Sequence, residues 1–263
     1  MKGQQPIGLF DSGIGGTSIW KEVVKLLPNE TTIYLADSKN APYGEKTSEE
    51  IIALSVKNTE FLLSKGCKLI IVACNTATTN AIDYLRKNYT IPFIGIEPAI
   101  KPAALLSKTG AIGILATKGT LSSKLFEKTT KEYTKNITTI EQDGEGLVPL
   151  IEQGKLNSPE INQLLTTYLK PMLKFNIDHL VLGCTHYPYL IPQIKKIIGE
   201  NVTIIDSGEA VARQTKAILE KHNLLSTSTN KSRHQFYTNA ETKVLKEILN
   251  DVSVEFSVEK LDF

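Results

Sequence analysis

The chain has 263 residues, of which 41% are hydrophobic and 22% charged, and this is ordinary usage for a globular protein. The length allows one large domain or two modest ones. A net charge of +2 is too small to indicate a nucleic-acid partner. No apolar run approaches the roughly 20 residues that a membrane span requires, and the first ten residues lack the features of a signal peptide. Three cysteines do not indicate a disulfide framework, so we expect a soluble, cytoplasmic protein with reduced thiols.

Short β-branched runs alternate with helical patterns along the chain, which predicts an α/β protein with mostly parallel sheets. The predicted strands are residues 7–10, 32–36, 69–73, 93–96, 111–116, 138–142, 179–183 and 202–205. The predicted helices of the first part are residues 18–27 and 49–65. Thr47 and Glu50 form a candidate capping box for the second of these, and Gly66 is placed to end it. From residue 210 onward we expect a helix, a strand at 235–237, a helix at 241–249 and a last strand at 253–256.

The chain also repeats one pattern. Residues 7–12 align with residues 112–117, a match that chance similarity between hydrophobic segments would explain by itself. Cys74 and Cys184, however, each follow an apolar strand-like run and each precede a predicted helix, and this favours two similar α/β lobes that face each other. The predicted division is a first lobe over 1–97, a second lobe over 98–206, and a C-terminal segment over 207–263 that returns to complete the first lobe.

The two equivalent cysteines indicate chemistry at the carboxyl ends of strands, where parallel α/β sheets bind ligands. A thiol beside a helix N-terminus feels a partial positive charge that lowers its pKa, and free N–H groups there bind carboxylates. Asn75 and Thr76 are natural helix caps, and Pro188 suits a first helical turn. Two thiols in equivalent places suit one small substrate, from which one thiol removes a proton while the other returns one.

Two further side chains extend this interpretation. His186 follows Cys184 closely and offers an acid/base partner that titrates near neutrality. Asp11 ends the first predicted strand, where its carboxylate would orient a thiol or an ammonium group.

Other interpretations of the same residues are weaker. A buried cysteine is more often a core residue than a catalyst, and Cys67 is interpreted in that way. A disulfide between Cys74 and Cys184 does not suit a reducing compartment. No metal site is predicted, because neither CxxC nor HExxH spacing occurs. Residues 11–16 resemble a phosphate-binding turn but lack the GxGxxG fingerprint and the Walker lysine. Ser12 lacks the surroundings of a nucleophile elbow.

Five blocks of the sequence resemble the glutamate racemase family, and they occur in the order found in that family. They are Phe10-Asp11-Ser12-Gly13-Ile14-Gly15-Gly16, Ala41-Pro42-Tyr43-Gly44, Ala73-Cys74-Asn75-Thr76-Ala77, Gly183-Cys184-Thr185-His186-Tyr187-Pro188 and Ile205-Asp206-Ser207-Gly208. This resemblance implies two α/β lobes related by a pseudo-twofold axis, with the active site between them. It also implies interconversion of L- and D-glutamate with neither cofactor nor metal, which supplies D-glutamate for peptidoglycan, and a homodimer.

The resemblance assigns roles residue by residue. Cys74 resembles the base that acts on the D enantiomer, with Asp11 as its partner, and Cys184 resembles the base that acts on the L enantiomer, with His186 as its partner. Glu152 matches a third family acid near the histidine. The other residues implied to hold substrate, besides Asp11 and His186, are Ser12, Asn75, Thr76 and Thr185 for the amino and α-carboxylate groups, and Pro42, Tyr43, Gly44 and Thr117 for the side-chain carboxylate.

Two departures from the family pattern affect loops near the site. Gly144 and Glu145 stand where the family often has a Cys-Pro pair, and Lys39 and Asn40 stand where an arginine is frequent. Two other functions remain open. One is an aspartate racemase with the same chemistry, and the other is a small-anion or nucleotide-binding α/β protein whose thiols are structural.

The proposed chemistry sets a physical requirement. An amino acid's α-hydrogen is a much weaker acid than a thiol of pKa about 8.5, and each pKa unit of mismatch costs about 1.4 kcal/mol. Dry, preorganised donors must therefore stabilise the developing negative charge. We expect closure of the lobes to accompany substrate binding.

Overall fold

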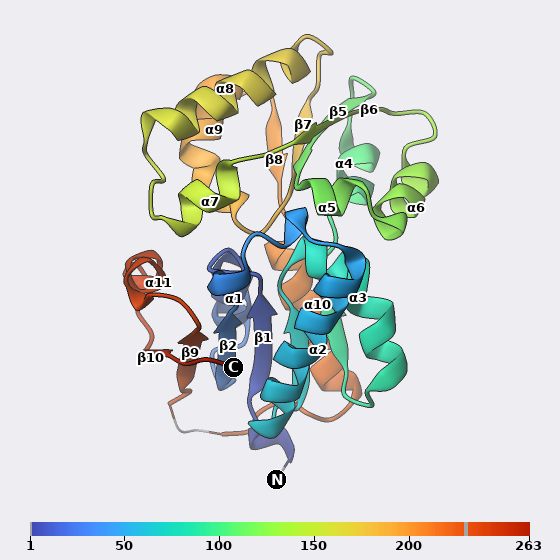
Figure 1. Cartoon of the computed structure of the whole chain (residues 1–263). Coiled ribbons are helices and arrows are strands. Elements are labelled where there is room, and N and C mark those ends of the chain that lie inside the picture. Colours follow the sequence, from blue (N-terminus) through green and yellow to red (C-terminus); the bar gives the residue numbers. More distant parts are fainter. Residues whose placement is uncertain (1, 229–230) are drawn as a thin grey trace.

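The computed structural model describes residues 2–228 and 231–263, which form two lobes with one sheet each (Figure 1). Every described strand pair is parallel, and the two sheets have the orders β10-β9-β2-β1-β3-β4 and β6-β5-β7-β8. The predicted α/β class with two lobes is therefore confirmed. In the described part of the chain, no helix combines the length and apolar character needed to cross a bilayer.

The first lobe contains the larger sheet. Its strands are β1 (Ile7–Asp11), β2 (Thr32–Ala36), β3 (Leu69–Val72), β4 (Phe93–Gly95), β9 (His234–Thr238) and β10 (Phe256–Lys260). Its helices are η1 (Lys2–Gln4), α1 (Thr17–Leu26), η2 (Ser38–Asn40), η3 (Tyr43–Glu45), α2 (Ser48–Ser64), α3 (Asn75–Asn88), α10 (Gly208–Lys221) and α11 (Thr242–Leu249). The C-terminal strands β9 and β10 extend this sheet beyond β2.

The second lobe contains the smaller sheet. Its strands are β5 (Ala111–Ala116), β6 (Thr138–Asp143), β7 (His179–Gly183) and β8 (Thr203–Ile205). Its helices are α4 (Ile100–Leu106), α5 (Lys118–Leu121), α6 (Lys124–Tyr133), α7 (Leu147–Glu152), α8 (Pro159–Leu173), η4 (Tyr187–Leu190) and α9 (Ile191–Ile198).

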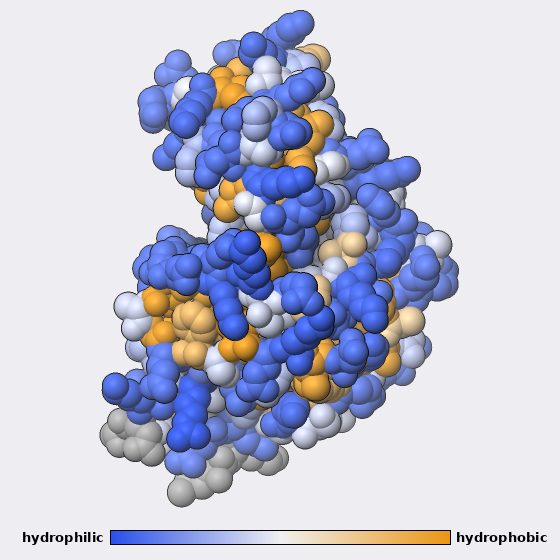
Figure 2. Space-filling model, turned by 60° about the vertical axis from the view of Figure 1, so that its left-hand side comes forward, coloured by the Kyte–Doolittle hydropathy of each residue, from blue (hydrophilic) through white to orange (hydrophobic). Residues whose placement is uncertain are grey.

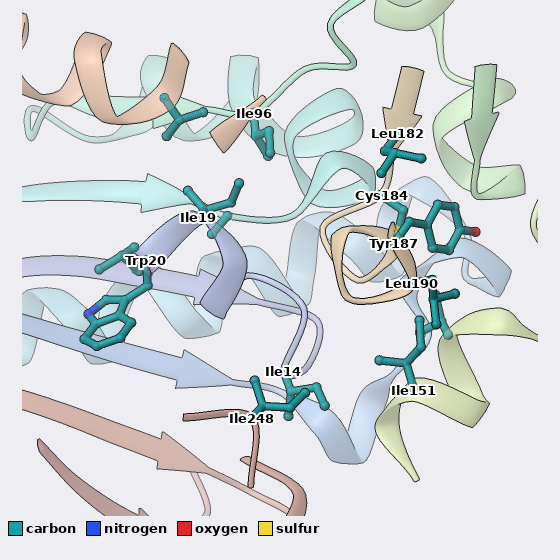
Figure 3. Packing of buried hydrophobic residues seen from close by; sticks show 14 of the residues in the cluster. Ile14, Ile19, Trp20, Ile96, Ile151, Leu182, Cys184, Tyr187, Leu190 and Ile248 are labelled. Atoms are coloured by element: carbon teal, nitrogen blue, oxygen red, sulfur yellow. The ribbon is translucent and has the colours of Figure 1, made fainter. Parts of the chain in front are cut away.

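The alternation of side chains along β1 explains why helices cover both faces of its sheet. Leu9 packs in one hydrophobic cluster with Trp20 of α1, while Phe10 belongs to another cluster with Ala77 of α3. The first cluster continues into the second lobe, where Ile151 and Leu190 belong to it. Figure 3 shows Leu190 and Ile151 near Cys184, at the boundary of the lobes, and Trp20 farther from it.

The predicted end signals of α2 are confirmed, because Thr47 and Glu50 form the reciprocal capping box and Gly66 follows the helix with φ +76°. The last predicted strand, residues 253–256, is wrong in its position. Strand β10 runs from Phe256 to Lys260, because Phe256 and Val258 alternate toward the core and set the register against β9.

The stretch after Cys184 is also different from the prediction of a helix directly after each cysteine. The Tyr187 backbone amide donates to the Cys184 carbonyl, and the Tyr189 amide donates to the His186 carbonyl. These bonds span three residues each, so the chain makes a 3₁₀ turn, η4 (Tyr187–Leu190). Prolines within η4 and at the start of α9 have no N–H for the α-helical ladder, and α9 begins only at Ile191.

Two segments connect the lobes. One follows β4 and leads to α4, and the other follows β8 and leads to α10. They lie side by side, because the Ser207 hydroxyl donates a hydrogen bond of 2.5 Å to the Glu97 carbonyl. The lobes also meet at the carboxyl ends of β1 and β7, where the Ile14 and Gly15 amides lie against Glu152 and His186.

Candidate active site

A small cavity lies between the lobes, and both Cys74 and Cys184 line it. Every other predicted site residue also lines it, except Asp11 and Glu152, which lie behind the lining residues. The lining residues are Ser12, Pro42, Tyr43, Gly44, Cys74, Asn75, Thr76, Thr117, Val148, Cys184, Thr185 and His186. The cavity volume is about 10 Å³, which is room for about one water molecule. Figure 2 shows the surface of the molecule indented between the lobes.

Cys74 occupies the N-cap position of α3, and its Sγ accepts a hydrogen bond from the Ala77 amide at 3.4 Å. The thiol lies 3.7 Å from Ser12 Oγ, to which it donates. Burial, and then the negative charge of Asp11, raise the pKa of Cys74 well above its ordinary value. The predicted lowering of this pKa by the helix N-terminus is therefore wrong for the closed form, since desolvation outweighs the amide contact.

Asp11 lies beneath the loop that follows β1 and is fully buried. Its Oδ2 accepts hydrogen bonds from the amides of Gly13 at 3.2 Å and Gly16 at 2.9 Å. Its Oδ1 accepts from the Thr185 hydroxyl of the other lobe at 3.4 Å. Burial raises the pKa of Asp11 above its ordinary value, although the positive charge of His186 opposes this. The carboxylate thus links the two halves of the site from below.

On the other side of the cavity, Cys184, His186 and Glu152 form a chain of polar contacts. Cys184 Sγ lies 3.7 Å from His186 Nδ1, and His186 Nε2 lies 2.6 Å from Glu152 Oε1. Burial disfavours the charged ring, but the hydrogen bonds to Cys184 and Glu152 prevail and raise the pKa of His186 well above its ordinary value. The ring is therefore an imidazolium at neutral pH and donates from both nitrogens.

The glycines of residues 11–16 make room for this chain of contacts. A Cβ atom at Gly13 would lie 2.0 Å from Glu152 Oε1, and one at Gly15 would lie 2.2 Å from His186 Nδ1. Real Cβ atoms do not approach other atoms so closely. The glycine run that resembled a phosphate-binding turn thus brings the first lobe against two polar side chains of the second.

Donors for a substrate carboxylate are present at the start of α3. Asn75 is 3% exposed, and its Nδ2 has no hydrogen-bond partner among the described residues. A buried amide donor without a partner is costly, so the site gains when an anionic group accepts from it. Across the cavity, Thr76 Oγ1 and Thr117 Oγ1 lie 2.8 Å apart, which joins α3 to the loop before α5.

The loop of Pro42, Tyr43 and Gly44 is fixed from below by Asp37. The Tyr43 hydroxyl donates to Asp37 Oδ2 at 2.5 Å and accepts from Asn58 at 3.2 Å. Asp37 is 1% exposed. Burial, and then the charge of Asp37, raise the pKa of Tyr43 well above its ordinary value, so the phenol remains a donor.

Sequence reasoning missed Val148, which lines the cavity, and Asp37 and Ser38, which support it. A signal existed for each of them: Val148 lies one helical turn before Glu152 in the sequence, and Asp37 and Ser38 directly follow the predicted strand at residues 32–36. A wider cavity of about 550 Å³ borders the small one and shares Pro42, Gly44, Thr117 and Val148 with it.

The sequence and the fold are similar to those of known racemases. A family model described as Asp/Glu/Hydantoin racemase matches residues 7–215. A glutamate racemase from Herpetosiphon aurantiacus is 43% identical over 251 residues, which are 95% of this chain and 99% of that protein. The solved structure of glutamate racemase isoform RacE1 from Bacillus anthracis has a TM-score of 0.86, 33% identity and coverage of 98% of both chains. Escherichia coli glutamate racemase, in complex with L-glutamate and the activator UDP-MurNAc-ala, has a TM-score of 0.85, 32% identity and coverage of 98% of both chains.

Proposed function

The chain belongs to the Asp/Glu/Hydantoin racemase family and is an isomerase, and we propose that it interconverts L- and D-glutamate by passing protons between two thiols. The observation that carries the two-thiol mechanism is that Cys74 and Cys184, each from a different lobe, line one cavity. Thiols that approach from two lobes can reach opposite faces of one α-carbon. Cys67, the third cysteine, is buried elsewhere, and burial raises its pKa to about 12.

Glutamate is the substrate favoured by the relatives, which are named glutamate racemases at 43–47% identity. The Asn75 amide and the N-terminal amides of α3 suit the α-carboxylate. The loop of Tyr43 and Gly44 would hold the side-chain carboxylate from the opposite end. A shorter substrate such as aspartate would leave that loop without its partner.

The protonation states of the two sides suit the L enantiomer. The pKa of His186 is raised well above its ordinary value, so a positively charged ring lies 3.7 Å from Cys184 Sγ, while burial keeps Cys74 a neutral thiol. In the proposed step, Cys184 removes the α-proton of L-glutamate and the Cys74 thiol donates its own proton to the opposite face. The products are D-glutamate, a Cys184 thiol and a Cys74 thiolate. Exchange with solvent then restores the starting state, and the same steps in reverse act on D-glutamate.

Asp11 and Glu152 would act behind the thiols. Asp11 lies close enough to influence the protonation of Cys74, and Glu152 holds the ring of His186. The lining residues Ser12 and Thr185 would contact the amino group or the α-carboxylate. Negative charge that develops on the substrate is then stabilised by fixed donors in a site from which water is excluded.

Substrate access requires separation of the lobes, because a cavity of about 10 Å³ does not admit an amino acid. The two connecting segments, tied by Ser207 and Glu97, are the natural hinge. Closure then removes water and brings both thiols to the α-carbon. We propose the lobe division 1–97, 98–206 and 207–263 for this motion.

The biological setting follows from the family resemblance. We propose that the enzyme supplies D-glutamate for peptidoglycan synthesis, and that it acts in the cytoplasm as a homodimer. Sedimentation of the purified protein tests the homodimer directly.

The proposed function is tested by circular dichroism of L-glutamate incubated with the purified enzyme and no added cofactor. The signal should decay to zero, and D-glutamate should give the mirror-image decay. Aspartate in the same assay distinguishes the alternative substrate. Incubation in deuterated water should place deuterium on the α-carbon. If neither amino acid exchanges its α-proton, the racemase assignment fails and a binding protein with structural thiols remains.

A further inference from the structure

The Glu152 carboxylate is held by donors from both lobes, and one of these donors, Ser38, has no part in the mechanism above. Oε1 accepts from His186 Nε2 at 2.6 Å, within the second lobe, and from the Ile14 amide of the first lobe at 2.7 Å. Oε2 accepts from Ser38 Oγ of the first lobe at 2.8 Å. The carboxylate therefore has donors on both oxygens.

The space for this carboxylate is built into the first lobe. Gly13 has no side chain where a Cβ atom would lie 2.0 Å from Glu152 Oε1. The Glu152 side chain is 13% exposed, so these hydrogen bonds form largely away from water. Ser38 begins η2 directly after Asp37, whose buried carboxylate also anchors Tyr43. The same short segment thus supports both sides of the site.

We propose that Ser38 is a positioning residue, which holds Glu152 against His186 only while the lobes are closed and so keeps the shared proton on the histidine ring. Hydrogen bonds to a carboxylate favour its charged form. With donors from Ser38 and Ile14 in place, the proton between Glu152 and His186 stays on Nε2, and the ring presents Nδ1–H to Cys184. This role rests on the proposed racemisation, in which His186 serves Cys184.

The dependence on closure follows from where the atoms are attached. Glu152 and His186 belong to the second lobe and stay together when the lobes separate. The bonds from Ser38 and Ile14 cross the lobe boundary and break on opening. The partner of Cys184 is therefore set in its working form at the moment when the substrate is enclosed.

The test is the primary isotope effect for each enantiomer deuterated at the α-carbon. L- and D-glutamate have equal free energies, so the ratio of their kcat/KM values is fixed and any variant lowers both values by the same factor. The isotope effects of the two enantiomers, in contrast, differ according to which thiol has become slower. In Ser38→Ala we expect about a tenfold loss of kcat/KM, as for one hydrogen bond to a charged group. The isotope effect should rise with deuterated L-glutamate, since proton removal by Cys184 becomes limiting, and fall with D-glutamate.

Two variants control this experiment. Ser38→Thr keeps the hydroxyl and should restore most of the activity. Ser64→Ala removes a hydroxyl that, among the described residues, donates to the Phe61 carbonyl near the end of α2, and this variant should behave as wild type. If the two isotope effects in Ser38→Ala change in the same direction, or stay unchanged, Ser38 serves general stability and the proposal is overturned.

A double-mutant cycle in denaturant unfolding tests the contact without activity. Ser38→Ala should lower the unfolding midpoint in the wild-type background and have a much smaller effect in a Glu152→Ala background. Equal effects in both backgrounds would overturn the proposal. Absence of racemisation by the wild type would instead overturn the proposed function, and the positioning role with it, while the cycle would still show the contact.

Discussion

The Gly15 amide nitrogen lies 3.2 Å from His186 Nε2, so the loop after β1 contacts the histidine ring beside Cys184 in the opposite lobe. Nε2 also lies 2.6 Å from Glu152 Oε1. Because this contact is shorter than the one to Gly15, the Nε2 proton points toward the Glu152 carboxylate. Backbone of one lobe and side chains of the other thus form a single unit. Changes at either side of this boundary are expected to affect the chemistry without unfolding the chain.

Alanine at position 15 tests the close approach at this boundary. In Gly15→Ala the new Cβ would lie 2.2 Å from His186 Nδ1, so the ring or the loop must move. We expect a loss of kcat of at least about a hundredfold, since displacements near 1 Å cost that much. Gly110→Ala is the control, because Gly110 has a positive φ but open space around it. Gly110→Ala should be less stable than wild type but keep the wild-type kcat. Full activity in Gly15→Ala would contradict the importance of the close approach between Gly15 and His186.

Removal of either thiol tests the two-base mechanism. Cys74→Ala and Cys184→Ala should each abolish racemisation while the circular dichroism of the fold is unchanged. Cys67→Ala is the matched control, since Cys67 lies in the core near Gly8 and Leu62 and should affect stability alone. Racemisation at the wild-type rate by Cys74→Ala or by Cys184→Ala would refute the two-base mechanism.

The support beneath the Tyr43 loop is tested by removing one hydroxyl. Tyr43→Phe leaves the buried Asp37 without the 2.5 Å donor and Asn58 without its acceptor. The free energy of unfolding should fall by about 1–3 kcal/mol. The KM for glutamate should rise, because the loop expected to hold the side-chain carboxylate loosens. Tyr84→Phe, at an exposed residue of α3, should change neither the free energy of unfolding nor KM. An unchanged KM in Tyr43→Phe would show that the bond from Tyr43 to Asp37 does not contribute to substrate binding.

The pH dependence of stability should reveal His234. Burial lowers the pKa of His234 from 6.5 to about 4, and its ring contacts Thr32 Oγ1 at 2.9 Å. The unfolded chain therefore binds a proton in a range where the folded chain does not. As pH falls from about 6.5 toward about 4, the free energy of unfolding should decrease, by at most about 1.4 kcal/mol per pH unit for one group. His234→Gln should lack this pH-dependent decrease, and denaturant unfolding across the same pH range measures it. Identical pH profiles for the wild type and the variant would show that His234 does not cause the decrease.

Much of the fold was predictable because local signals agreed with tertiary structure. The strand at residues 111–116 and the capping box at Thr47 were placed correctly, since a buried β-branched run and a reciprocal cap are local patterns. The last strand was misplaced, because its register depends on which of several apolar residues faces the core, and pairing with β9 decides that. The turn after Cys184 was misjudged because prolines allow a helical start but not an α-helical ladder.

The site was predictable in its members and less so in its electrostatics. The sequence motifs predicted that Cys74 and Cys184 share one site, and both cysteines line one cavity in the structure. The catalytic roles of the two cysteines remain predictions. The pKa of Cys74 was predicted in the wrong direction, because desolvation by two closed lobes does not show in a local motif. Asp37 and Ser38 were missed for a similar reason, since their partners are a tyrosine fixed by folding and a glutamate from the other lobe.

The small volume between the thiols has a consequence for inhibitor discovery. Compounds fitted to the closed geometry would find space for little more than a water molecule beside Cys74 and Cys184. Useful ligands would instead have to be matched to the separated lobes, or wedge into the wider hollow near Lys46 and Lys118 and block the path inward. Their potency would then be governed by how often the enzyme opens.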